Sequence, residues 1–564
     1  MHKKKKTERQ FKVLTSMSML CDVLRGHGSK NAFMWFDRSR TLHNMSYREL
    51  ADSILYESAG FASLGFKDKR IAIVGETSPE WVASYIAAVA SGNVAIPLDR
   101  ELNFGELLGF LEFAEADAVI YSDAFNAKFA PYIGKLPTVK HFIPMSPEEN
   151  TDDPAILSLS DLKEKGKAAS AGYTFPLTDQ DRMAVMLFTS GTTGTSKCVM
   201  LSERNVIAAV NGGGLSVEFF PDDTIVSTLP LHHTYELCCM LAALGYGMNI
   251  GINDSLKHLL KNYKEFKPTG LVLVPLIVNT FYKRIWDEAK KTGKDKKLTL
   301  AMTTSELLRK VGIDARRKLF AEVLNNFGGR INKIICGGAA MNPTIAECLE
   351  ELGIEVCEGY GITECSPIIS VNPYYAPKRG SVGPSVPCCR VRIDAERIND
   401  AGLEEGEIQV RGDNVMLGYY KNPEATAEAF TFDGWFRTGD IGYMDKDGYI
   451  FITGRKKFVI VLENGKNVFP EEIEDKLVEL PRVTEGVVIG RKKGESVILT
   501  AIIYPDLTKF PAGASDEKII EGLRGDIAEM NRGLVSYKQI KGIEIRRTEF
   551  EKTTSRKIKR HLIK

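Results

Sequence analysis

Apolar runs of strand length alternate with helical patterns in the first third of the chain. Such runs occupy residues 70–75, 94–98 and 117–121, as expected for buried strands. After the first run, Ser-Pro-Glu at 78–80 supplies an N-cap, a proline at the first helical position and an early acid, and Gly92 ends the helix. This β-α-β-α-β order predicts a mostly parallel sheet covered by helices.

The same alternation returns in the middle of the chain. Residues 271–275 and 331–336 are predicted strands, a helix begins at 342–343 and is closed by Gly353, and another strand begins at 355–357. Together with the first third, this region predicts an α/β fold.

Three regions differ from this pattern. Residues 287–333 form a charged helical segment, for which a solvated face is the usual explanation and contact with a membrane surface is the alternative. From about residue 380, closely spaced glycines punctuate short β-rich runs, which indicates a small barrel or antiparallel sheet. Residues 458–564 are expected to form a compact α+β unit with a basic end.

Length and composition narrow the class of protein. A chain of 564 residues is too long for one core, so two or more domains are expected. The net charge of +1 gives no general attraction to nucleic acid, so no nucleic-acid partner is expected. The basic N-terminus is not followed by an apolar signal region, and the apolar stretches are too short or interrupted to span a membrane. Ten cysteines without a C-x-x-C spacing indicate neither a zinc site nor a disulfide framework, so we expect a cytoplasmic protein.

The segment FTSGTTGTSKCVMLS at 188–202 contains the first cluster of candidate functional residues. It follows an apolar strand-like run and combines hydroxyl side chains, two glycines and Lys197. Small residues, N–H and OH donors and one fixed positive charge suit a polyphosphate. The spacing is not that of a Walker A loop, because no Lys-Ser or Lys-Thr follows Gly194 directly. A plain polar loop is the alternative interpretation.

A second cluster lies at 357–364, where glycines flank an aromatic ring and a carboxylate follows. The flat face of Tyr360 suits stacking on a purine. Thr363 is a candidate for a phosphate contact, and Glu364 for holding a Mg²⁺ ion that also binds phosphate oxygens. The alternative is a strand-to-turn junction with an exposed acid.

Two further clusters occupy the last third of the chain. In Trp-Phe-Arg-Thr-Gly-Asp at 435–440, a tight turn presents Asp440, whose carboxylate could accept two hydrogen bonds from a ribose. Such a turn is common, so by itself it is weak evidence for a ribose site. The basic tail at 550–560 would usually be a solvated terminus, but the flanking Ile558 and Leu562 indicate that it packs.

These four clusters, in this order, resemble the acyl-adenylate-forming family, which includes acyl-CoA synthetases, peptide-synthetase adenylation domains and luciferases. Segments 229–236, 337–343 and 464–474 look most similar to long-chain fatty acid–CoA ligases. The resemblance implies a large N-terminal adenylation domain at 1–456, with layered, mostly parallel sheets, helices and a barrel-like β subdomain at about 380–456. A small mobile α+β domain at 457–564 would follow.

Carried over to matching positions, the resemblance also implies roles for individual residues. Lys557 would bridge the substrate carboxylate and the α-phosphate, His233 would lie near that carboxylate and the acyl entrance, and Lys457 would be the hinge between the domains. The implied catalytic residues are Lys557, His233 and Glu364, the metal ligands Thr189 and Glu364, and the CoA channel residues Gly465 and Lys466. The implied nucleotide-binding residues are Thr189, Ser190, Gly191, Thr192, Thr193, Gly194, Lys197, Gly338, Ala339, Glu358, Gly359, Tyr360, Gly361, Thr363, Asp440, Ile452 and Arg455.

This chain departs from the family pattern at two positions. Arg556 stands where glycine commonly precedes the terminal lysine, and the alignment of Lys557 follows from Ser555 and Ile558 on either side of it. Cys198 stands where glycine is usual after the loop lysine, which changes little.

The resemblance implies ATP-dependent activation of a fatty acid to acyl-AMP, followed by transfer to coenzyme A with release of AMP; pyrophosphate leaves in the first step. ATP, Mg²⁺ and coenzyme A are the implied cofactors. Transfer to the phosphopantetheine of an acyl carrier protein and a catalytically silent member of the fold are the alternatives. The length of the acid, peripheral membrane contact, and a monomer or homodimer are left open by the sequence.

Overall fold

The computed structural model describes residues 11–146, 155–189, 197–399, 401–462, 467–493, 496–552 and 558–563. These residues form two compact units. The first takes the described residues up to Arg390 together with 410–434, and the second takes 391–409 and the described residues from Trp435 onward. Each unit is described by itself.

The first unit contains a seven-stranded sheet in which the predicted alternation of strands and helices is confirmed. Helix α3 (Pro79–Ala90) begins at Ser78, whose hydroxyl accepts from the Trp81 N–H, and Gly92 follows it with a φ of +83°. Strands β3 to β6 pair in parallel. The sheet order is β17 (Gly418–Tyr419), β8 (Lys197–Ser202), β7 (Met183–Thr189), β4 (Val94–Leu98), β3 (Arg70–Val74), β5 (Ala118–Tyr121) and β6 (His141–Pro144).

An eight-stranded sheet forms the second layer of this unit, with parallel pairing in its interior and antiparallel strands at both edges. Its order is β14 (Ile368–Val371), β13 (Glu355–Gly361), β12 (Lys333–Cys336), β11 (Gly270–Leu273), β9 (Thr224–Ser227), β10 (Asn249–Ile252), β1 (Asn31–Phe36) and β2 (Leu42–Ser46). The predicted strand at 271–275 was too long. Pro275 is instead the first residue of a helix, where its missing N–H costs nothing.

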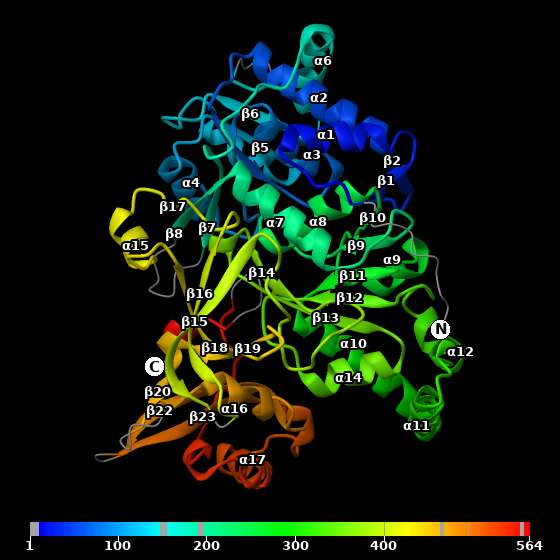
Figure 1. The fold of residues 1–564 in the computed structure, drawn as a ribbon, viewed down its shortest axis with the longest axis vertical. Helices are drawn as coiled ribbons and strands as arrows, with labels where there is room; N and C mark the ends of the chain where they lie inside the picture. The colour runs from blue at the N-terminus through cyan, green and yellow to red at the C-terminus, as the bar shows by residue number, and fades with distance from the viewer. Residues whose placement is uncertain are drawn as a thin grey trace. The chain divides into compact units, whose positions relative to one another are not determined.

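Helices α7 (Glu203–Ser216) and α8 (Thr234–Tyr246) lie between the two sheets (Figure 1). Helix α7 contacts β7 and β8 of one sheet and β14 of the other, while α8 contacts β9. The other helices of the unit are α1 (Met17–Gly26), α2 (Tyr47–Ser63), α4 (Phe104–Phe113), α5 (Asn126–Phe129), α6 (Leu159–Ala169), α9 (Leu259–Phe266), α10 (Pro275–Lys291), α11 (Asp295–Lys310), α12 (Arg316–Leu319), α13 (Ala321–Asn325), α14 (Pro343–Glu351) and α15 (Pro423–Glu428). Helices α10 to α13 account for most of the charged segment predicted to be helical.

The second unit combines a four-stranded sheet with an α+β end. The sheet order is β15 (Cys389–Ile398), β16 (Glu404–Gly412), β18 (Phe436–Met444) and β19 (Ile450–Arg455). The remaining elements are β20 (Ile460–Val461), β21 (Asn467–Val468), α16 (Pro470–Leu477), β22 (Val483–Lys493), β23 (Ser496–Pro505), α17 (Asp516–Arg532) and β24 (Gly542–Ile545). The predicted domain boundary at 456/457 falls inside this unit and stays a prediction.

The end of the chain packs, but not through both predicted residues. Ile558 and Ile563 lie against a small core of Val487, Ile502 and Phe550. Leu562, which was predicted to pack, is 48% exposed, because the short helical turn at the end directs its neighbour Ile563 inward instead.

Across the described part of the chain, none of the helices combines the length and the hydropathy needed to cross a bilayer.

Candidate functional site

The predicted phosphate loop connects two antiparallel strands. Thr189 ends β7 and pairs with Lys197, the first residue of β8, and the Thr189 hydroxyl donates to the Lys197 carbonyl at 3.3 Å. The loop residues Ser190, Gly191, Thr192, Thr193 and Gly194 lie outside the described residues. A strand follows the loop, whereas a Walker A loop opens a helix, so the exclusion of that motif is supported by the fold.

Lys197 and Glu364, which are far apart in the sequence, meet around Tyr419. The Lys197 ammonium lies 4.5 Å from the centroid of the Tyr419 ring, and the Tyr419 hydroxyl donates to Glu364 Oε1 at 2.9 Å. Burial and the adjacent Glu364 carboxylate raise the pKa of Tyr419, so the phenol keeps its proton and acts as a donor. Tyr419 was not identified from the sequence, where its only signal is an aromatic pair after a glycine.

The residues predicted to hold adenine lie where parallel strands β12 and β13 end. Gly338 follows β12, and Gly359, Tyr360 and Gly361 close β13. The strand predicted to begin at 355–357 runs to Gly361, and a 3-10 turn follows it. Ligands of open α/β sheets bind at this carboxyl edge. A Cβ on Gly361 would collide with the Pro367 carbonyl, so packing alone explains that glycine.

The other residues predicted around adenine and phosphate differ in exposure. Ala339 is exposed, and Thr363 begins a short 3-10 turn that contains Glu364. Burial raises the pKa of Glu358 to about 7, partly offset by the Met341 N–H. Ala339 therefore offers a backbone surface and Thr363 a hydroxyl. Glu358 offers a carboxyl group that is readily protonated near neutrality.

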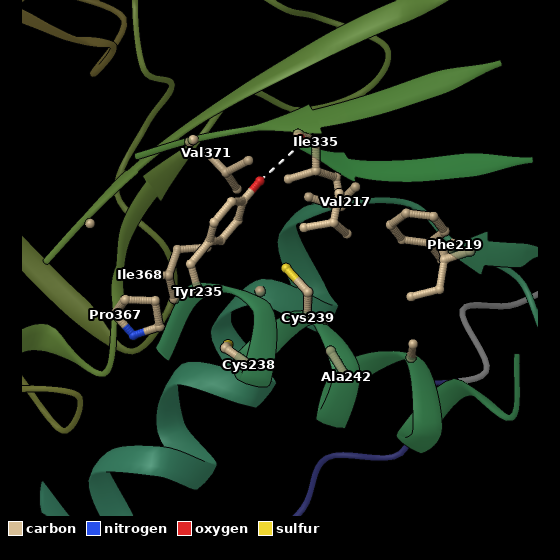
Figure 2. Close-up of a pocket in the computed structure, with 18 of the residues that line it drawn as sticks. Val217, Phe219, Tyr235, Cys238, Cys239, Ala242, Ile335, Pro367, Ile368 and Val371 are labelled. Atoms are coloured by element: carbon tan, nitrogen blue, oxygen red, sulfur yellow. Dashed lines mark hydrogen bonds between the residues drawn. The ribbon is translucent and has the colours of Figure 1, made fainter. Parts of the chain in front are cut away.

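An apolar pocket of about 850 Å³, part of it open to solvent, begins at these strand ends and runs between α7 and α8 (Figure 2). The pocket is lined by four residues predicted from the sequence, Gly338, Gly359, Tyr360 and Gly361, and by side chains that were not identified from it. They come from the segment that follows α7 and from α8, β11, β12 and β14: Val217, Phe219, Tyr235, Cys239, Ala242, Val272, Ile335, Ile368 and Val371.

Tyr235 and Gly213 give this pocket its shape. The Tyr235 hydroxyl donates to the Ile335 carbonyl at 3.0 Å (Figure 2). It also donates to the Leu273 carbonyl at 3.2 Å, and the two bonds fix the ring against the sheet. Gly213 lies inside α7, where glycine costs about 1 kcal/mol relative to alanine. A Cβ there would meet only Ile368 Cδ1, at 3.8 Å, so the glycine leaves space that a larger side chain would fill.

The predicted catalytic residue His233 is the N-cap residue of α8, two positions before Tyr235. Its ring centroid lies 4.2 Å from that of His232, whose Nε2 is 3.6 Å from Asp99 Oδ2. Burial and the neighbouring His233 lower the pKa of His232 well below its usual value. Both rings therefore lie beside the first turn of the helix that forms one pocket wall.

Glu236, also in that first turn, was not identified from the sequence. Burial raises its pKa to about 8, although the Ser227 hydroxyl and the backbone N–H groups of Thr228 and Leu229 counteract the shift. The carboxyl group therefore lies close to residues 227–229, in the segment that leads to the two histidines.

The predicted ribose site lies in the second unit. Asp440 on β18 and Arg455 on β19 are paired across the two strands, and Arg455 Nε lies 3.0 Å from Asp440 Oδ1. Asp440 is 2% exposed, whereas Ile452 on the same hairpin is 36% exposed. Lys457 lies in the 3-10 turn after β19, with its ammonium 4.7 Å from the Phe458 ring centroid. Gly465, Lys466 and Lys557 lie outside the described residues, so their roles stay predictions.

Family comparison agrees with this arrangement. A model of the AMP-binding enzyme family matches residues 22–420, and a model of the AMP-binding enzyme C-terminal domain matches residues 457–564. The chain belongs to the AMP-binding enzyme family. The family predicted from the four clusters is thus confirmed, and so is the α/β fold class with a separate C-terminal region.

Relatives within the AMP-binding enzyme family match over most of their length. Long-chain-fatty-acid–CoA ligase 1 of Homo sapiens is 30% identical, over 89% of this chain and 77% of the human protein. Long-chain-fatty-acid–CoA ligase FadD15 of Mycobacterium bovis is 28% identical, over 91% of this chain and 89% of that protein.

Solved structures share the fold. ATP-bound MatB from Rhodopseudomonas palustris superposes with a TM-score of 0.74 at 24% identity, covering 97% of this chain and 98% of MatB. The A domain of a carboxylic acid reductase from Segniliparus rugosus, in complex with AMP and a co-purified carboxylic acid, gives a TM-score of 0.78 at 22% identity, covering 98% of this chain and 92% of that domain.

Proposed function

We propose that this AMP-binding enzyme is a fatty acid–CoA ligase, which joins a fatty carboxylate to AMP and then transfers the acyl group to coenzyme A. The observation that carries the proposal is the apolar pocket beside the strand ends predicted to hold adenine. Gly338, Gly359, Tyr360 and Gly361 belong to both. A carboxylate whose tail filled the pocket would therefore have its head group beside the nucleotide.

The lining of the pocket favours a fatty acid over a polar one. Three tyrosines (Tyr235, Tyr246 and Tyr360) and two cysteines are the only polar side chains among the described residues that line it, and none of the lining side chains is a carboxylate, lysine or arginine. A second charged group on the substrate would be buried there without a partner, which is costly. An alkyl chain would gain about 0.8 kcal/mol for each CH₂ group removed from water.

The adenylation step brings two anions together, so the protein must offset their repulsion. Lys197 supplies a fixed positive charge at the base of the phosphate loop, and Tyr419 leaves the second oxygen of Glu364 available to other partners. Protein sites commonly bind Mg²⁺ through one or two carboxylates plus substrate phosphates, and Glu364 suits that role. When bound, the ion would neutralise charge on the phosphate oxygens.

The acceptor thiol belongs to coenzyme A in this proposal. The names of the relatives, long-chain-fatty-acid–CoA ligases, support coenzyme A over the phosphopantetheine of a carrier protein. Product formation with each acceptor, measured with the same acyl-AMP, distinguishes the two.

The central test is pyrophosphate release with butyrate, octanoate, palmitate and oleate, and with benzoate as the aryl control. We expect release with the fatty acids that fill the pocket and little with benzoate. Gly213→Leu should shift the preferred acid to a shorter chain, whereas Gly213→Ala, which adds only a Cβ at ordinary contact distance from Ile368, should keep the wild-type preference. Absence of pyrophosphate release with every carboxylate would refute an adenylating enzyme, and an unchanged preference in Gly213→Leu would refute the acyl pocket.

A further inference from the structure

Helix α11 has apolar side chains on two opposite faces. Leu298, Ala301 and Met302 pack against the core that fills the space beside α10 and α14. Leu300 and Leu307 lie on the opposite side of the helix, because residues two positions apart are separated by about 200°. They are 67% and 60% exposed.

The exposed apolar face continues beyond the end of α11. Val311 is 71% exposed and Ile313 is 53% exposed. Val311 lies four residues after Leu307, which continues the same stripe by one helical turn. Singly exposed aliphatic residues are ordinary, but four within one short segment mark an interaction surface. We call Leu300, Leu307, Val311 and Ile313 the α11 apolar face.

Positive charge surrounds this face. Residues 283–318 contain 12 lysine and arginine residues and 5 aspartate and glutamate residues, a net charge of +7 in a chain whose total is +1. Some of these cations are used within the fold, such as Arg309, which is paired with Glu351 at 2.7 Å. Lys290, Lys291, Lys296 and Lys297 are exposed and form no ion pair with another described residue.

The combination selects one class of partner. Exposed leucines between lysines are typical of helices that lie in the interface of an anionic bilayer, where aliphatic groups enter the acyl boundary and ammonium groups contact the headgroups. A polyanion such as nucleic acid would pair with the lysines but leave the leucines in water. A second copy of this chain would bring two strongly positive faces together, which costs free energy.

We propose that the α11 apolar face docks on an anionic lipid bilayer, with Leu300, Leu307 and Val311 inserted and Lys296 and Lys297 at the headgroups. This surface is separate from the pocket residues, so the inference does not depend on the proposed activity. Docking here would place the protein where long-chain carboxylates concentrate.

Vesicle sedimentation of the full chain tests the proposal, with phosphatidylcholine vesicles that contain or lack phosphatidylglycerol. We expect binding to the anionic vesicles that weakens as salt is added. Leu300→Ser combined with Leu307→Ser should lower the partition coefficient about tenfold or more, because it removes two inserted side chains. Lys296→Glu combined with Lys297→Glu should weaken the preference for anionic vesicles, because it lowers the net charge of residues 283–318 from +7 to +3.

Matched controls separate docking from general surface effects. Leu177 is fully exposed and lies outside the α11 apolar face, so Leu177→Ser should bind as the wild type does. Circular dichroism of each variant checks that the fold is retained. Wild-type binding by the double leucine variant, or no binding by the wild type, would overturn the proposal. So would a dimer in vesicle-free solution that the leucine substitutions dissociate, because the face would then be a contact between copies.

Discussion

Replacement of Tyr419 by phenylalanine removes one hydroxyl from the site and leaves the rest of the side chain. The ring that faces the Lys197 ammonium at 4.5 Å remains, so that contact is retained. What is lost is the hydrogen bond to Glu364 Oε1 at 2.9 Å. Tyr419→Phe therefore tests whether this bond orients the carboxylate that we propose to hold Mg²⁺.

The size of the effect follows from the charge of the acceptor. A hydrogen bond to an ionised group contributes about 1.5–3 kcal/mol. If the bond serves the transition state, its loss should slow adenylation by about 10- to 150-fold, since 1.36 kcal/mol corresponds to a factor of ten. The substitution leaves the packing volume nearly unchanged, so the melting temperature should fall little.

ATP–pyrophosphate exchange measured as a function of Mg²⁺ concentration is the suitable assay. We expect a lower rate and a higher Mg²⁺ concentration for half-maximal exchange, because Glu364 would no longer be held in one orientation. Tyr420→Phe is the matched control: it removes contacts of similar length to Arg70, at 2.8 Å, and Glu115, at 3.1 Å, away from this cluster. Its Mg²⁺ dependence should match that of the wild type.

Two results would contradict this reasoning. A wild-type rate and Mg²⁺ dependence in Tyr419→Phe would show that the hydrogen bond does not orient Glu364. An equal loss of rate in Tyr420→Phe would show that the segment acts through folding and not through the carboxylate.

Three other predictions concern separate parts of the chain. Lys557→Ala should abolish acyl-AMP formation yet leave thioester formation from supplied acyl-AMP largely intact, and equal loss of both half-reactions would argue against a terminal lysine used in one step only. Asp440→Asn removes the charge paired with Arg455, and we expect the KM for ATP to rise about tenfold; an unchanged KM with a lower melting temperature would assign the pair to folding alone. Burial raises the pKa of Glu236 from its usual 4.5 to about 8, so the folded chain retains a proton that the unfolded chain has lost, and stability falls as pH rises from about 4.5 to 8. Glu236→Gln should remove this dependence of stability on pH. The measurement is the protection of α8 from hydrogen exchange in the variant divided by that in the wild type, and we expect this ratio to be larger at pH 8 than at pH 6. An equal ratio at both pH values would exclude the effect.

The layered α/β core could be predicted from the sequence because its signals are local. Ser78 and Gly92 mark the two ends of α3, and apolar runs mark β3, β4 and β5. Pro275 was misassigned because a proline after an apolar run is compatible with both a strand end and a helix start. Neighbouring residues alone do not distinguish the two.

Residues of the site could be predicted only where they belong to a recognisable sequence motif. Lys197 and Glu364 belong to recognisable clusters, and the structure brings them to one ring. Tyr419 and the pocket residues Gly213 and Ala242 were missed because their role depends on contacts between distant elements. On a helix, small and apolar residues at such positions look the same whether they face a core or a cavity.

The two-residue strand β17 determines which tyrosine serves the cluster. Gly418 pairs with Met200 and Tyr419 with Val199, while the Tyr420 N–H donates to the Cys198 carbonyl, so the alignment with β8 is held on both sides. Consecutive strand residues point in opposite directions, and a shift by one position would exchange the surroundings of the two phenols. Loss of a single residue just upstream of this strand is therefore expected to damage catalysis more than the replacement of several side chains, a constraint for any attempt to shorten or graft this part of the enzyme.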